Sequence, residues 1–151
     1  MPARLIDVRL ESGILDTRGF IARVAQGAGT PGGLASFIGS VRGGDKVEAL
    51  ELLHYEPLTL PGMQDIACAA DARFDLLSLG LLHNLGVMRP SQEIVCVAAG
   101  ARHRRDAIEA VDFCMDHLKS AAWFWKQELR DGEWHWIEPR DQDHSDLARW
   151  T

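Results

Sequence analysis

Two apolar runs followed directly by a long amphipathic helix constrain the fold of this chain most strongly. The runs LGLLHNLG (79–86) and EIVCVAAG (93–100) predict two strands joined by a turn that contains Pro90. The helix follows, with an apolar stripe at helical spacing formed by Ala107, Val111, Cys114 or Met115, and Leu118. Asp106 and Glu109 resemble a capping box, so we expect the helix to begin near Asp106.

The rest of the chain alternates between strand-like and helix-like patterns. Period-two alternation and turn residues predict further strands at RLIDVRL (4–10), GGLASFIGSVR (32–42), VEALELLHY (47–55) and EWHWIE (133–138). The second and third of these are expected to form a hairpin around the Gly-Gly-Asp turn at 43–45. Helical spacing predicts helices at DTRGFIARVAQ (16–26) and from Pro61 to Phe74. Because strands and helices are mixed without a strict β-α-β order, we predict an α+β fold.

Length, charge and cysteine content limit the classes of function. The 151 residues predict one domain over 1–151, with a polar tail at about 140–151. The net charge of −6 does not favour nucleic acid or an anionic membrane as a partner, so any anion site must be local. The N-terminus has no long apolar run and the three cysteines form no C-x-x-C pair, which together predict a cytoplasmic protein. No cysteine has a basic neighbour that would activate it as a sulfur nucleophile.

Two basic groups stand where elements begin or end. His103 and Arg104 lie just ahead of the predicted helix, whose unpaired N–H groups and dipole already favour an anion. They predict a phosphate or carboxylate site, although a solvated basic turn would show the same pattern. Arg42 ends the strand FIGSVR before a glycine turn, where ligand-binding side chains often lie. A lone arginine in a hairpin can equally be solvated.

The segment HLKSAAWFWKQE (117–128) sets two lysines among aromatic residues. It contains no helix breaker, so we expect the helix to continue and to carry Lys119 and Lys126 on one face, roughly 10 Å apart. Partial desolvation beside Trp123, Phe124 and Trp125 would lower their pKa values and suit them to act as a base or nucleophile. The alternative is that both lysines bury their stems and keep their charges in water.

The two ends of this helix cannot serve one compact ligand within a single chain. Arg104 and Lys119 are separated by roughly 20 Å along the helix axis. If both bind the same ligand, the solution is a homodimer in which one subunit's helix start meets the other's helix end. We therefore hypothesise a homodimer with composite sites.

Four blocks of the sequence also carry a family resemblance. They are FIGSVRG, then V-x-A-L-x-L followed by HYEPLTLPGM, then HNLGVMRPSQEIVCV, and finally RHRRDAIEAVDFCMDHLKSAAWFWKQE with the trailing W-x-W-I-E-P-R. In the last block the basic pair, the helix, both lysines and the glutamate after them match in order. From about Leu34 to Trp150, the chain thus resembles the large, catalytic subunits of molybdopterin synthase, the MoaE family.

This resemblance implies a fold, partners and a reaction. The fold would be an α/β hammerhead, and a central homodimer would carry a ubiquitin-like small subunit at each end. The reaction would be a sulfur transfer from the C-terminal Gly-Gly thiocarboxylate of that subunit to cyclic pyranopterin monophosphate. The product is the dithiolene of molybdopterin, in molybdenum cofactor biosynthesis. The sequence shows no metal cluster or nucleotide loop, so neither a metal nor another cofactor is expected.

The resemblance also implies roles for individual residues. Lys119 and Lys126 are the expected catalytic residues. The expected substrate-binding residues are Ser40, Val41, Arg42, His103, Arg104, Gln127, Glu128 and Arg140.

Three departures from the family pattern bear on activity. The loop GGDK after Arg42 is short, Asn84 replaces the arginine of the frequent His-Arg-x-Gly, and Trp123 stands where a proline is common. The last two leave open an inactive scaffold that binds a ubiquitin-like partner without catalysis. A third interpretation, an RNA-binding module built on the arginines and tryptophans, conflicts with the acidic balance.

Overall fold

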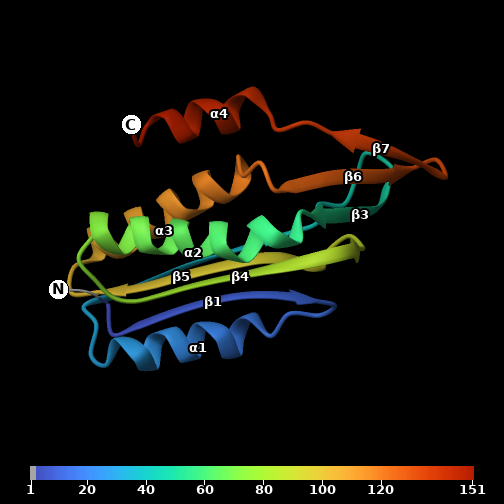
Figure 1. The fold of residues 1–151 in the computed structure, drawn as a ribbon. Helices are drawn as coiled ribbons and strands as arrows, with labels where there is room; N and C mark the ends of the chain where they lie inside the picture. Colours follow the sequence, from blue (N-terminus) through green and yellow to red (C-terminus); the bar gives the residue numbers. More distant parts are fainter. Residues whose placement is uncertain (1–2) are drawn as a thin grey trace.

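The computed structural model describes residues 3–151 and combines four helices with a seven-stranded sheet (Figure 1). The elements follow in the order β1 (Leu5–Ser12), α1 (Thr17–Ala28), β2 (Gly33–Ser40), β3 (Val47–His54), α2 (Glu56–Arg73), β4 (Leu76–Met88), β5 (Glu93–Ala101), α3 (Arg104–Lys119), β6 (Phe124–Arg130), β7 (Glu133–Ile137) and α4 (Asp141–Ala148). The predicted α+β class is confirmed. No helix of the described residues is long and apolar enough to cross a membrane.

Strand β4 joins two halves of the sheet. The first half consists of β1, β2, β5 and most of β4, and the second half consists of the end of β4 with β3, β6 and β7. The strand order is β2-β5-β4-β3-β6-β7, and β1 pairs with β4 in parallel while all other pairs are antiparallel. Along β4, pairing with β1 ends at Leu85 and pairing with β3 begins at Gly86. Gly86 has a φ of 86°, a left-handed conformation that side chains disfavour. This glycine therefore lets one strand change partners and turn from the first half of the sheet into the second.

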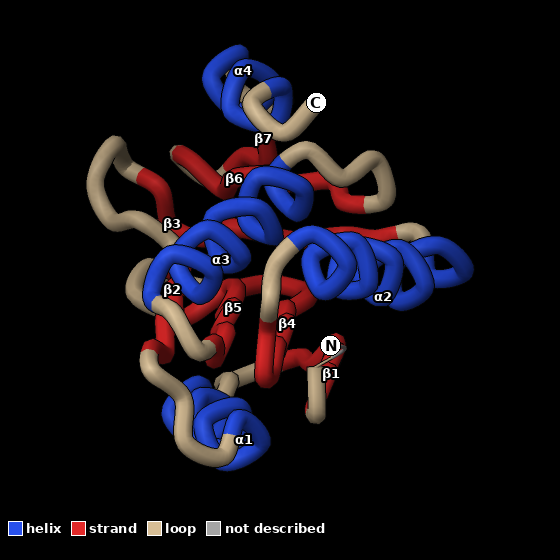
Figure 2. The backbone as a smooth tube through the Cα atoms, turned by 90° about the vertical axis from the view of Figure 1, so that its left-hand side faces the viewer, coloured by secondary structure: helices blue, strands red, loops and turns tan. Residues whose placement is uncertain are grey.

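Helices cover both faces of the first half of the sheet. Figure 2 shows α1 on one side of β4 and β5 and the pair α2 and α3 on the other. The strands β4 and β5 are buried on both faces, and alternate residues of β5 belong to different cores. Val95 and Val97 lie in the main cluster with residues of α2 and α3, whereas Cys96 and Ala98 lie in the cluster with Phe20 of α1. A third, smaller cluster joins the halves and contains Val41, Leu50, Leu52 and Met88.

The predicted hairpin between β2 and β3 is wrong. Strand β2 pairs only with β5 and forms an edge of the sheet, whereas β3 pairs with the end of β4 and with β6. The glycine-rich segment after Arg42 therefore passes from one half of the sheet to the other. The reason is register: Leu50 and Leu52 bury against Met88 of β4 rather than against β2.

Three boundaries also differ from the sequence prediction. Helix α2 begins at Glu56, because Pro57 suits a first helical turn and Pro61 is tolerated inside the helix. Helix α3 begins at Arg104, so Asp106 lies in its first turn rather than at its cap. The same helix ends at Lys119 instead of continuing to Lys126.

The polar tail contains a helix that the sequence did not predict. Helix α4 is held by Trp150, whose ring packs edge-on against Phe74 and Phe113 and whose Nε1 donates to Asp116 at 2.7 Å. Arg149 also donates to Asp116. Because these contacts reach α2 and α3, the last residues of the chain are fixed on the body of the protein.

The turn between α3 and β6 rests on α2. The Tyr55 N–H donates to the Trp123 carbonyl at 2.9 Å, and the indole of Trp123 lies against Gly62. A Cβ added at Gly62 would overlap this ring. The glycine thus gives the indole its place, and the indole fixes the path of the chain between the two lysines.

Replacing Gly62 with alanine tests this contact. In an unhindered helix interior the change would stabilise the protein by about 1 kcal/mol. Here we expect Gly62→Ala to lower the free energy of unfolding by about 1–3 kcal/mol, because the methyl group displaces the indole. Urea unfolding measures it, and Gln64→Ala on the exposed face of α2 is the control. A Gly62→Ala protein more stable than the wild type would contradict the contact.

Candidate active site

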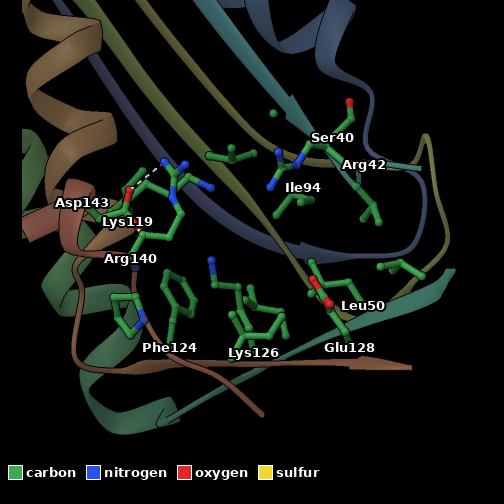
Figure 3. Close-up of a pocket in the computed structure, with 18 of the residues that line it drawn as sticks. Ser40, Arg42, Leu50, Ile94, Lys119, Phe124, Lys126, Glu128, Arg140 and Asp143 are labelled. Atoms are coloured by element: carbon green, nitrogen blue, oxygen red, sulfur yellow. Dashed lines mark hydrogen bonds and ion pairs between the residues drawn. The ribbon is translucent and has the colours of Figure 1, made fainter. Parts of the chain in front are cut away.

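A cavity of about 580 Å³ lies at the junction of the two sheet halves. Its walls come from the end of β2, the paired strands β3 and β6, the C-terminus of α3 and the segment that leads into α4. Figure 3 shows basic side chains that project toward this space from several of these elements. The cavity therefore depends on segments that are far apart in the sequence.

Both predicted catalytic lysines line the cavity, but not through one helix face. Lys119 is the last residue of α3, and Ser120 leaves the helical conformation (φ −109°, ψ 10°). The chain then turns and pairs with β3, so Lys126 comes from strand β6. Alternation along β6 puts Phe124, Lys126 and Glu128 on the cavity side. The expectation of a continuous helix is wrong, yet the lysines meet in the same cavity.

Both lysine pKa values lie below their ordinary value of 10.5. Burial is the main cause for each, because it disfavours the charged ammonium. Repulsion by Lys126, Arg140 and Arg42 lowers the pKa of Lys119 further, while Asp143 opposes the shift. The amines thus become free bases more readily than exposed lysines do.

The apolar wall beside these amines is not made of indole rings. Among the described residues it includes Phe124, Leu118 and Leu52, and neither neighbouring tryptophan lines the cavity. Trp123 packs toward α2, and Trp125 lies on the opposite face of β6 with 48% of its surface exposed. Lys119 is exposed overall and Lys126 is half-buried, so the desolvation is partial, and the apolar lining consists of aliphatic side chains, Met115, Phe37 and Phe124.

Arg140 and Asp143 form one edge of the cavity at the start of α4. The Asp143 carboxylate accepts hydrogen bonds from the backbone N–H of Arg140 at 3.1 Å and from its guanidinium at 3.2 Å. Burial alone would raise the pKa of Asp143, but these bonds hold it below its ordinary value. Asp143 therefore offsets part of the positive charge that Arg140 brings.

The predicted residues at the end of β2 also line the cavity. The Val41 N–H donates to the Gln92 carbonyl, and its own carbonyl accepts from Ser91, both at 2.9 Å. This backbone anchoring holds Ser40 and Arg42 on either side of the buried Val41. Figure 3 shows Arg42 across the cavity from Arg140 and Lys126. Glu128, also predicted, lines the cavity and pairs with Arg130 at 3.3 Å.

Three predicted substrate-binding residues lie elsewhere in this chain. His103 and Arg104 stand at the N-terminal end of α3, the opposite end from Lys119, and neither lines the cavity in the described residues. Gln127 points to the other face of β6, where its amide donates to Glu51. The structure therefore brings together seven of the ten predicted residues: Ser40, Val41, Arg42, Lys119, Lys126, Glu128 and Arg140.

His83 is a cavity residue that the sequence prediction missed. Its ring is 6% exposed and stacks on Phe124 with the ring centroids 4.4 Å apart. Burial lowers the pKa of His83 to about 4, and the nearby charges of Lys119 and Lys126 lower it as well. The available signals were a histidine inside the apolar run LGLLHNLG and its place in the family block HNLGVMRPSQEIVCV, neither of which assigns it a role.

Asn84 and Trp123, the two departures from the family pattern that would be compatible with an inactive scaffold, both lie outside the cavity. Asn84 is fully buried and donates to the carbonyls of Gly13 and Glu93 at 2.7 and 3.0 Å. It ties three segments together on the side of β4 away from the lysines and does not line the cavity. Trp123 lies against α2, as described above. An uncharged residue at position 84 therefore removes no cation from the cavity.

Neither a cysteine nor a cluster of metal-ligating side chains lines this cavity among the described residues. Burial raises the pKa of Cys96 to about 11 and that of Cys114 to about 12, so both stay protonated at neutral pH. No cysteine lines the cavity in residues 3–151. The same residues contain no group of three or more His, Cys, Asp or Glu side chains arranged to hold a metal ion. The cavity offers localised positive charge, two amines with lowered pKa values and a neutral imidazole.

Comparison with known proteins identifies a family. The family model described as MoaE protein matches residues 11–121. The molybdopterin synthase catalytic subunit of Caulobacter vibrioides is 39% identical over 151 residues, covering 99% of this chain and 97% of the relative. The solved molybdopterin biosynthesis MoaE protein of Burkholderia ambifaria superposes with a TM-score of 0.82 at 35% identity, covering 96% of this chain and 97% of that one.

A more distant solved structure shares the fold. It is a protein–protein complex of subunits 1 and 2 of molybdopterin-converting factor from Helicobacter pylori. The superposition has a TM-score of 0.75 at 23% identity and covers 88% of this chain and 91% of that chain.

The coupling between cavity charges predicts opposite pKa changes in two variants. Lys126→Met removes a repelling charge, so we expect the pKa of Lys119 to rise. Asp143→Asn removes an attracting charge, so the pKa of Lys119 should fall further. Carbon-13 NMR titration of the Lys119 Cε resonance measures both. A wild-type Lys119 that titrates at 10.5 or above would contradict the desolvated site.

Proposed function

The chain belongs to the MoaE protein family, and from this membership we propose that it is the catalytic subunit of a molybdopterin synthase that transfers sulfur in molybdenum cofactor biosynthesis. The sulfur donor is the C-terminal thiocarboxylate of a ubiquitin-like small subunit. The acceptor is cyclic pyranopterin monophosphate, which becomes a dithiolene. The observation that carries the proposal is the meeting of Lys119 and Lys126, both with lowered pKa values, in one cavity.

The cavity suits the chemistry of the donor. A thiocarboxylate arrives with its sulfur already activated, so the enzyme needs no thiol of its own. Replacing oxygen by sulfur requires proton transfer close to the attacked carbon, and a lysine whose pKa is lowered gives up its proton more readily than an ordinary lysine does. The lysines can also stabilise the oxyanion that forms at the carboxyl carbon when it is attacked.

The charges of the cavity suit an anionic substrate. Arg42 and the lysines supply positive charge in a protein whose net charge is −6. Arg140 adds to it, although Asp143 offsets part of that charge. The substrate phosphate and the thiocarboxylate end of the partner's tail would both be attracted to this region and not to the acidic remainder of the surface.

In the proposed enzyme, His103 and Arg104 belong to the active site of a second copy of the chain. They lie at the far end of α3 from Lys119, where unpaired N–H groups favour an anion. In a homodimer, the helix start of one subunit would complete the cavity of the other. The active site of the proposed enzyme is thus composite, with lysines from one subunit and the phosphate-binding pair from its partner.

Lys119→Ala is expected to abolish molybdopterin formation. The assay combines the purified protein, a thiocarboxylated small subunit and the cyclic monophosphate. Loss of the amine removes both the proton carrier and part of the oxyanion stabilisation, so we expect turnover to fall by at least about 100-fold. The fold and oligomeric state should be unchanged, which circular dichroism and light scattering check. Turnover at the wild-type rate would remove Lys119 from the mechanism.

Mixed dimers test the composite site. Arg104→Ala alone should raise the KM for the cyclic monophosphate. When Lys119→Ala and Arg104→Ala chains are mixed and allowed to exchange, half of the dimers are hybrids, and each hybrid regains one intact site out of two. We expect recovery to about a quarter of wild-type turnover. No recovery in verified hybrids, or a protein that stays monomeric in solution, would contradict the composite arrangement.

A further inference from the structure

The hydrogen bond of His83 fixes which nitrogen of its ring carries the proton. Nδ1 lies 2.8 Å from the backbone carbonyl of Asn84. A carbonyl oxygen can only accept, so Nδ1 must be the donor. In a neutral imidazole the other nitrogen, Nε2, is then left with an unshared electron pair. Burial keeps the ring neutral, since its pKa is lowered to about 4.

Nε2 has no protein partner among the described residues, yet it is not sealed in the core. The one fully enclosed side-chain nitrogen or oxygen without a partner there is Nε1 of Trp123. Nε2 of His83 forms no hydrogen bond with the described residues, and the ring is part of the cavity wall. The unshared pair is therefore accessible from the cavity, on a ring held by stacking on Phe124.

This acceptor differs in kind from the polar groups around it. The basic side chains of the cavity bring hydrogen-bond donors, and the carboxylates of Glu128 and Asp143 are engaged with arginines. Two further acidic side chains, Asp45 and Glu138, also line the cavity. His83 alone in this set combines a neutral charge, nine-tenths burial and an unused acceptor. A cationic group at this position would repel the lysine ammonium groups and lower their pKa values further. An anionic group would attract them and raise their pKa values.

We propose that His83 is a substrate-positioning residue of the sulfur-transfer site, whose Nε2 accepts a hydrogen bond from an N–H or O–H group of the bound reactants. This inference rests on the proposed function for its reactants. The donor group has two possible sources, a peptide N–H of the small subunit's tail or an N–H or O–H of the pterin substrate. The shared chemistry is a neutral donor that enters a cavity rich in positive charge.

Nitrogen-15 NMR of the histidine rings tests the inference without turnover. In the free protein, we expect Nδ1 of His83 to carry the proton and Nε2 to show the resonance of an unprotonated nitrogen. Saturation with a small subunit that ends in an ordinary carboxylate, or with the cyclic monophosphate, should move the Nε2 resonance toward that of a hydrogen-bonded nitrogen. The ligand that moves it identifies the source. A protonated Nε2 in the free protein, or no movement with either ligand, would overturn the proposal.

Two matched variants give a kinetic test. Glutamine can offer an acceptor at the position of Nε2, whereas asparagine reaches only the position of Nδ1 and keeps the bond to Asn84. Both lose the stacking on Phe124, so stability effects should be similar. We expect kcat/KM for the identified ligand to be about tenfold higher in His83→Gln than in His83→Asn. Equal values in two folded variants would count against the acceptor role.

The outcomes separate this inference from the proposed function. If the wild-type protein forms no molybdopterin with a competent small subunit and substrate, the proposed function fails. If the wild type is active and the Nε2 resonance stays unmoved, only the role of His83 fails. An active wild type with a shifted Nε2 and a preference for glutamine over asparagine supports both.

Discussion

The pairing of β6 with β3 is the interaction on which the site depends. The chain leaves α3 at Lys119 and returns within a few residues as a strand, so an amine from a helix end and an amine from a strand reach the same cavity. Strand β3 pairs with β6 along one edge and with the last residues of β4, from Gly86 onward, along the other. A glycine in a strand, a helix end and one strand pair together create the cavity.

The local electrostatics of the cavity oppose those of the whole protein. Several cations gather around one cavity in a chain with a net charge of −6, and their mutual repulsion costs free energy. Asp143 relieves part of this cost, and the lowered pKa values of the lysines relieve another part. A bound anion would relieve the rest, so the cavity favours ligands of negative charge.

Local patterns predicted the elements well and their assembly less well. Alternation and turn residues found β1, β2, β3 and β7, apolar runs found β4 and β5, and helical spacing found α1 and α3, because these signals depend on nearby residues. The partner of β3 could not be inferred, since strand pairing depends on which distant strand buries Leu50 and Leu52. Segment 120–126 was misassigned because no helix breaker marks the turn, and pairing with β3 outweighs local propensity. Family motifs pointed to both lysines, and one of these motifs contains His83, but the position of His83 in the cavity depends on contacts with residues distant in the sequence.

The attachment of Trp150 has a consequence for how the protein can be altered at its C-terminus. Arg140 and Asp143 edge the cavity from the start of α4, and the other end of this short helix is secured on Asp116 through Trp150 and Arg149. Arg149 and Trp150 therefore hold one wall of the cavity in place although neither lines it. Trimming them, or crowding them with an appended sequence, would loosen that wall from a distance while leaving every lysine in the chain.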